Sequence, residues 1–215
     1  MNPETLAHLS KADPVMRKLI RKVGDCLLAP ESRRSPFESL VRAVAHQQLN
    51  GTAAERILGR FEALFPKKRF PSAEDIETVT DAQLRGAGFS RAKILSIRDI
   101  AAKTVEGVIP TARKIDRLSD DEIVERLVTV RGVGRWTVEM LLIFQLGRPD
   151  VLPVDDFGVR SGFKIALDLP EMPRPKELLA YGERWRPFRT TAAWYLWRAT
   201  DKDKKVPDER KKREV

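Results

Sequence analysis

The stretch VRGVGRWTVEML, residues 130–141, places two glycines one residue apart immediately before a helical run. Glycine permits positive φ and close approach of the backbone, so Gly132 and Gly134 favour a tight turn. Amide N–H groups in such a turn point outward at a helix N-terminus, where they bind a phosphate without recognising a base. Val133 is expected to pack between the two flanking helices. Short glycine turns also serve as plain structural corners, so the turn alone leaves both interpretations open.

Helical periodicity continues on both sides of this turn. Apolar residues recur at i, i+3, i+4 and i+7 over 37–44, and a similar stripe covers 57–65. Thr80 to Gln83 and Ser119 to Glu122 match capping boxes, and a last helix is expected at about 187–200. No convincing alternating strand is present. The sequence therefore predicts an all-α protein.

Charge and composition restrict the classes of function. The chain has 40 Lys and Arg against 31 Asp and Glu, a net charge of +9, which favours an anionic partner such as nucleic acid. Cys26 is the single cysteine and only His8 and His46 are histidines, which disfavours disulfides and zinc or iron–sulfur sites. No signal peptide or membrane span is evident, so we expect a cytoplasmic, nucleoid or nuclear protein that is not secreted.

Three blocks of sequence together resemble one family. GVGRWTVEMLLIFQLGRPDVLPVDDFGV (132–159) resembles the helix–hairpin–helix and Gly/Pro…Asp motif of the HhH-GPD DNA glycosylases. AVAHQQLNGTAAERI (43–57) and GERWRPFRTTAAWYLWRA (182–199) resemble further blocks of its 3-methyladenine DNA glycosylase II (AlkA-like) branch. The blocks span about residues 37–200 in the order found in the family.

The resemblance implies a two-lobed, all-α HhH-GPD fold with the active-site cleft between the lobes. Residues 1–200 would form the core, with 37–125 as a middle helical lobe and 1–36 plus 126–200 as a second lobe that carries the hairpin. The archetype of the AlkA-like branch also has an N-terminal β-rich domain. Because few residues precede the first block here, we expect no N-terminal β domain in this protein. The charged tail, 201–215, is expected to fray.

Two adjacent carboxylates follow the apolar run VLPV. Excision of a base passes through an oxocarbenium-like sugar, which needs a fixed negative charge or a base for water beside the anomeric carbon. The resemblance gives that catalytic role to Asp156, and Asp155 is then expected to cap the following helix or support its neighbour. The alternative is that both carboxylates only cap.

Aromatic residues near the motif suggest a base pocket. Lyase-competent relatives place a Schiff-base Lys at the position of Trp136, so the resemblance implies a monofunctional enzyme. Trp136, Phe157 and Trp197 are candidates for the pocket walls, and electron-rich rings favour cationic alkylated bases. Met140 stands where a further aromatic residue is often found, which leaves the substrate range open.

Several polar positions are predicted to contact DNA. In the family, the loop that follows the helix at 37–44 enters the minor groove and fills the gap left by a flipped base. Gln48 is the first candidate for the residue that fills this gap, Asn50 is the second, and Gln47 is a supporting residue. His46 has no evident acid–base partner, and Arg189 fits either a phosphate contact or a structural role. The complete set of predicted DNA-binding residues is Gly132, Val133, Gly134, Arg135, Thr137, Gln48, Asn50, Arg91 and Lys93.

The predicted function is hydrolytic release of 3-methyladenine and related methylpurines from damaged double-stranded DNA, followed in base excision repair by an AP endonuclease. We expect a monomer that needs no cofactor and no catalytic metal, although a structural monovalent cation at the hairpin is compatible with the resemblance. Alternatives are a non-catalytic DNA-damage-binding or architectural protein, a metal-dependent nuclease using Asp155 and Asp156, and a glycosylase for oxidised or mismatched bases.

Overall fold

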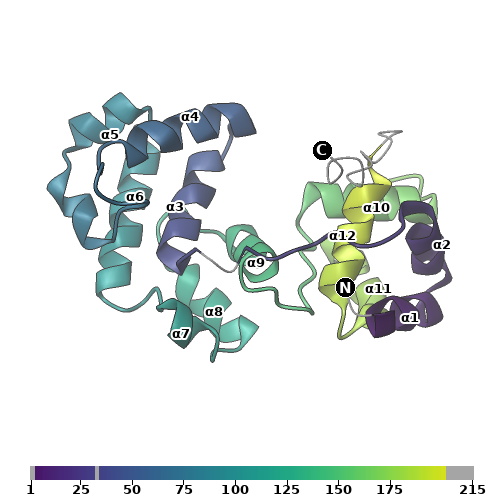
Figure 1. The fold of residues 1–215 in the computed structure, drawn as a ribbon. Coiled ribbons are helices and arrows are strands. Elements are labelled where there is room, and N and C mark those ends of the chain that lie inside the picture. Colours follow the sequence, from purple (N-terminus) through teal and green to yellow (C-terminus); the bar gives the residue numbers. More distant parts are fainter. Residues whose placement is uncertain (1–2, 32–33, 202–215) are drawn as a thin grey trace, which may run out of the picture. The chain divides into compact units, whose positions relative to one another are not determined.

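The computed structural model describes residues 3–31 and 34–201, and all regular elements in these ranges are helices (Figure 1). The predicted all-α class is therefore confirmed for this part of the chain. Residues 202–215, most of the predicted charged tail, lie outside the described ranges. Among the described helices, none combines the length and the apolar character that a membrane crossing requires.

The chain divides into two compact units. Unit 1 contains the described residues of 1–28 and 149–215, and unit 2 contains those of 29–148. These boundaries differ from the predicted lobes, because the hairpin and the helix after it fall in unit 2. The reason is packing: the helix that follows the hairpin contacts the first and the penultimate helices of unit 2.

Unit 2 is built from short helices with local caps. Thr80 and Ser119 both form the predicted capping boxes, with Gln83 and Glu122 respectively. The core contains fully buried Leu40, Phe61 and Ile97. The elements are α3 (Pro36–His46), α4 (Gly51–Glu62), the 3-10 helix η1 (Glu74–Thr78), α5 (Asp81–Ala87), α6 (Arg91–Val105), α7 (Ala112–Ile115), α8 (Asp120–Leu127) and α9 (Arg135–Phe144).

Unit 1 joins the beginning of the chain to its last helices. Asp13 caps the second helix and is fully buried, and its carboxylate accepts hydrogen bonds from Trp185 Nε1 at 2.8 Å and Tyr181 Oη at 3.3 Å. A buried carboxylate needs such donors to replace water. The elements are α1 (Pro3–Ala12), α2 (Pro14–Val23), α10 (Phe157–Leu167), α11 (Pro175–Gly182), the 3-10 helix η2 (Glu183–Trp185) and α12 (Arg189–Ala199).

The last helix is held in place at its first residue. It begins at Arg189, two residues later than predicted. The Arg189 guanidinium donates to both carboxylate oxygens of Asp150, at 2.7 and 3.0 Å, and to the Asp150 carbonyl at 3.0 Å. Because only 11% of its side chain is exposed, Arg189 has a structural role.

α10 and α12 pack against each other more extensively than any other pair of described helices (Figure 1). The two backbones approach closely at Gly162 of α10, where a Cβ would overlap the carbonyl oxygen of Leu196 and lie 2.5 Å from its carbonyl carbon. The obstacle is backbone, which cannot rotate aside. Glycine at this position therefore allows the two helices to approach closely, and this approach positions the side chains at the start of α10 and the end of α12.

Candidate active site

The glycine hairpin lies between α8 and α9 in unit 2. Gly132 has φ +76°, whereas Gly134, the N-cap residue of α9, has φ −92°, so only the first glycine needs the left-handed region. A Cβ at position 132 would also overlap Ser96 Oγ on α6. Val133 is buried, as predicted, and its amide donates to the Val130 carbonyl at 3.0 Å.

The hairpin is attached to the neighbouring elements of unit 2 by two hydrogen bonds. The amide of Arg131 donates to Asp99 Oδ2 on α6 at 2.7 Å, and Gln47 Nε2 donates to the Gly132 carbonyl at 2.9 Å. Gln47 immediately follows α3, so it connects the hairpin to the loop of residues 47–50. This loop and the hairpin therefore form one bonded substructure.

The first turn of α9 differs in part from the prediction. The side chain of Arg135 is 62% exposed and pairs with the nearly buried Glu139 at 3.1 Å. Thr137 is 5% exposed, so its side chain has little surface for a phosphate contact. We therefore assign Thr137 to the wall of the cavity described below, and a phosphate contact from this turn remains a prediction only for Arg135 and the backbone amides.

The loop 47–50 has one strained residue and one capping residue. Gln48 is exposed and has φ +58°, an uncommon conformation for a residue other than glycine. Asn50 is the N-cap of α4, and its side-chain oxygen accepts from the amide of Ala53 at 2.8 Å. Gln48 is therefore accessible to a partner, whereas the side-chain oxygen of Asn50 is used for capping. The plug role of either residue remains a prediction.

Lys93 supports the same loop from α6. Its ammonium donates to the carbonyls of Ala45 and Gln47, both at 2.8 Å, and burial lowers its pKa. Lys93 thus satisfies carbonyls at the C-terminal end of α3, which otherwise have no helical partner. Arg91, the first residue of α6, is exposed. A phosphate contact remains a prediction for both residues.

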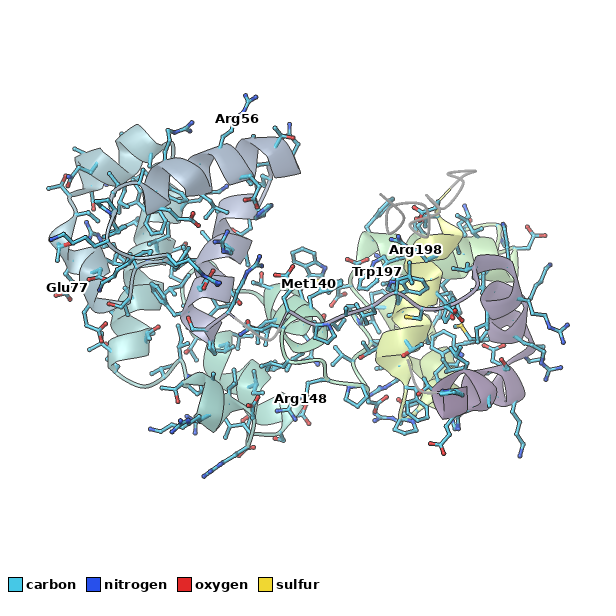
Figure 2. All side chains as sticks on the ribbon, viewed as in Figure 1. Arg56, Glu77, Met140, Arg148, Trp197 and Arg198 are labelled. Carbon is cyan, nitrogen blue, oxygen red and sulfur yellow. The ribbon has the colours of Figure 1, made fainter. Side chains whose placement is uncertain are left out.

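A cavity of about 660 Å³ lies within unit 2, between α3 and α9. Trp136, 46% exposed, and Met140 line it from α9, and Met140 is labelled in Figure 2. His46 also lines the cavity, and its Nε2 lies 3.0 Å from Glu55 Oε1 on α4. The sequence did not reveal this pair because the two residues belong to different helices, and helical periodicity relates only positions within one helix.

Asp156 is the N-cap of α10 in unit 1. Its Oδ1 accepts from the amide of Val159 at 2.7 Å and from the indole N–H of Trp197 at 2.8 Å. Of the two roles predicted for Asp155, capping of this helix was wrong, because Asp156 makes that contact and Asp155 is exposed; support of Asp156 stays a prediction. A helix N-terminus and two donors stabilise an ionised carboxylate.

Two aromatic residues of unit 1 accompany Asp156. Phe157 is the first residue of α10 and is 73% exposed. Trp197 lies near the end of α12 (Figure 2) and packs partly against the core of unit 1. Since Trp136 and Met140 belong to unit 2, a single base pocket formed by all four residues remains a prediction.

The described residues contain no group of three or more His, Cys, Asp and Glu side chains arranged to hold a metal ion. Asp155 and Asp156 are adjacent, but no third ligand of these types joins them within residues 3–31 and 34–201. Two carboxylates alone are a poor metal site for phosphodiester hydrolysis.

Comparison with known proteins gives consistent matches. Residues 41–187 match the model of the HhH-GPD superfamily base excision DNA repair proteins. The chain is 43% identical over 196 residues to DNA-3-methyladenine glycosylase 1 of Schizosaccharomyces pombe, covering 90% of this chain and 85% of the relative.

Solved structures agree in fold. The 3-methyladenine DNA glycosylase of S. pombe in complex with abasic DNA matches with a TM-score of 0.80 and 42% identity, covering 91% of this chain and 95% of that one. A DNA-3-methyladenine glycosidase from Bacillus halodurans matches with a TM-score of 0.83 and 33% identity, covering 92% and 89%. The chain belongs to the HhH-GPD superfamily of base excision DNA repair proteins.

Proposed function

We propose that this protein is a monofunctional DNA-3-methyladenine glycosylase that acts in base excision repair. The observation that carries the proposal is Asp156, which stands at the end of the family motif as the cap of α10 and accepts from the Trp197 indole. The relatives in yeast and Bacillus, matched over nearly their whole length, are named for this activity.

The reaction releases the base and leaves an abasic site. The N-glycosidic bond breaks and its electron pair departs with the base, which neutralises the positive charge of a 3-methylpurine. The oxygen of a water molecule bonds to C1′ of the sugar, and that water loses one proton. Asp156 would supply the negative charge that stabilises the intermediate oxocarbenium character, and it would accept the proton of the water.

Damaged double-stranded DNA is the proposed partner. The amide groups of the hairpin at Gly132 and Gly134 and the exposed Arg135 would bind phosphates, and Gln48 would fill the space of the flipped base. The net charge of +9 supports this partner. Action as a monomer and transfer of the abasic product to an AP endonuclease complete the proposal.

Alkylated bases are the proposed substrates because of their charge. Trp136 lines the unit 2 cavity with a partly exposed indole, and an electron-rich ring attracts a cationic base more than a neutral one. The helix sequence RWTVEMLLIF of α9 contains no lysine, so α9 has no primary amine for a Schiff base with the sugar. Borohydride treatment during turnover is therefore expected to trap no covalent adduct; a trapped band would contradict the monofunctional assignment.

The decisive experiment measures methylpurine release from methylated duplex DNA by chromatography. Asp156→Asn keeps an oxygen that can cap α10, since Asn is as good a cap as Asp, but removes the negative charge. We expect wild type to release methylpurines and Asp156→Asn to release none while it still binds abasic DNA.

Asp155→Asn is the matched control, because it removes the neighbouring exposed carboxylate and leaves the cap in place. Its excision rate is expected to stay close to that of wild type. If Asp156→Asn released methylpurines at the wild-type rate, Asp156 would have no catalytic role. If wild type released no base but bound damaged DNA, the protein would be a damage-binding protein or would act on oxidised or mismatched bases.

A further inference from the structure

We propose that Trp197 is a positioning residue for Asp156: its indole N–H holds one carboxylate oxygen, and Gly158 leaves the space that this contact needs. The proposal rests on the proposed function, because it concerns the catalytic carboxylate of that reaction. It also changes the role predicted for Trp197 from the sequence, which was to form a wall of the base pocket.

The first argument is the hydrogen-bond geometry around one atom. Asp156 Oδ1 accepts from the Val159 amide at 2.7 Å and from Trp197 Nε1 at 2.8 Å. The backbone donor fixes the carboxylate at the start of α10, and the indole donor arrives from α12. Two donors on one oxygen fix the rotation of the carboxylate about its Cβ–Cγ bond. The orientation of the other oxygen, Oδ2, is then determined as well.

The second argument is the space that the chain reserves for this contact. Gly158 follows Asp156 by two residues, and a Cβ there would lie 2.8 Å from Trp197 Cδ1 and 3.1 Å from both Trp197 Nε1 and Asp156 Oδ1. Gly158 does not have a positive φ, so its backbone conformation does not call for glycine. Glycine is required at this position because a larger residue would crowd the contact between the indole and the carboxylate.

The third argument is the anchoring of the indole itself. Trp197 packs partly against the core of unit 1, and the residue before it in α12, Leu196, meets α10 at Gly162. A ring held in this way cannot follow a mobile carboxylate, so the carboxylate is held by the ring. Catalytic groups gain rate from such orientation, because less reorganisation is left for the reaction step.

The contact predicts a specific pattern of kinetic effects. Trp197→Phe retains an aromatic ring for stacking but removes the N–H donor. We expect the single-turnover rate of methylpurine release to fall by about tenfold to a hundredfold, the range of one hydrogen bond to a charged group. The affinity for abasic DNA is expected to stay at the wild-type value, since the donor serves the chemical step rather than binding.

Gly158→Ala tests the same contact without changing the indole. The added methyl group must displace Trp197 from Asp156, so the rate is expected to fall in the same range as for Trp197→Phe. The double variant is expected to be no slower than the slower single variant, because the one shared contact is already lost. If the factors by which the two single variants lower the excision rate multiplied in the double variant, the two residues would act independently, and the proposal would be overturned.

Trp194→Phe is the control for the loss of an indole from α12. Trp194 is 9% exposed and contacts Tyr195 edge to face with 5.0 Å between ring centroids, away from the Asp156 contact. Its variant is expected to lose stability but to keep the wild-type excision rate. If Trp197→Phe also excised bases within about twofold of the wild-type rate, the positioning role would be refuted while the glycosylase function stood.

A second measurement does not depend on activity. In a ¹H–¹⁵N spectrum, the indole N–H signal of Trp197, assigned by its absence in Trp197→Phe, is expected to move in Gly158→Ala and in Asp156→Ala. The signal of Trp194 is expected to stay in place. An unmoved Trp197 signal would refute the contact, whether or not the protein releases methylpurines, so failure of this inference is separable from failure of the proposed function.

Discussion

Substitution of Gly162 by Ala is the sharpest test of the packing that supports the active carboxylate. The new Cβ would overlap the Leu196 carbonyl oxygen, and its distance to the carbonyl carbon must increase from 2.5 Å to at least the 3.4 Å at which ordinary contact begins. α10 and α12 must therefore separate along their main interface. Overpacking of this kind costs about 1–3 kcal/mol, and a backbone obstacle places this case near 3 kcal/mol.

Thermal unfolding followed by tryptophan fluorescence provides the assay. Three of the four tryptophans, Trp185, Trp194 and Trp197, belong to unit 1, so the signal reports mainly on that unit. For a chain of this length, about 3 kcal/mol corresponds to a decrease in Tm of about 6–12 °C. The excision rate should fall too, because separation of the helices moves Trp197 relative to Asp156.

Gly59→Ala, in α4 of unit 2, is the control for replacing a helical glycine that no neighbouring atom crowds, with the free energy of unfolding measured by circular dichroism. A Cβ at this position meets nothing within 4 Å, so the free energy of unfolding should rise by about 0.5–1 kcal/mol from helix propensity alone. The reasoning would be refuted if Gly162→Ala unfolded at the wild-type temperature or higher, as Gly59→Ala is expected to do. That result would mean that α10 and α12 do not approach as closely as described.

Three further predictions concern other contacts. Asp13→Ala removes the buried acceptor of Trp185, and the free energy of unfolding in urea should fall by about 2–3 kcal/mol; a loss well below 1 kcal/mol would show that the contact contributes little. Burial raises the pKa of Tyr195 to about 12 and also raises the pKa of Tyr181. Tyrosinate absorbance of the folded protein should therefore appear well above pH 10, and the free energy of unfolding should fall as the pH rises from about 10 to about 12. Titration of both tyrosines at the ordinary value in the folded protein would contradict this. Lys93→Met removes the donors that hold the loop 47–50, so the affinity for abasic DNA should fall while its salt dependence stays unchanged. If the slope of log affinity against log salt concentration fell by about one instead, Lys93 would be a phosphate contact.

Local features of the sequence were sufficient to predict the helical class and several helix starts. The capping boxes at Thr80 and Ser119 involve side chains three residues from their partners, and both form as expected. The glycine hairpin and the buried Val133 also depend on neighbouring residues. The error over Asp155 and Asp156 has a local cause as well: either of two adjacent carboxylates is a good cap, and residue type does not determine where the first helical turn begins.

Long-range contacts explain what the sequence left open. α9 joins unit 2 because its apolar face packs on α3 and α8, and no linker composition marks this division. Lys93 resembles a surface cation in the sequence, yet its ammonium donates hydrogen bonds to the carbonyls of Ala45 and Gln47, which precede it by 48 and 46 positions. Side chains that meet across such separations are brought together by the packing of whole helices, which periodicity does not specify.

By itself, the sequence determined that the chain is helical, that it carries a helix–hairpin–helix motif followed by Asp156, and that its charge suits a nucleic acid. These properties depend on residue type and on spacing within a few turns of chain. Only the tertiary structure decided which oxygen of Asp156 is held, and by what. Trp197 lies 41 positions from Asp156, and the two meet because Gly158 and Gly162 let α12 approach α10 more closely than any larger side chain would allow.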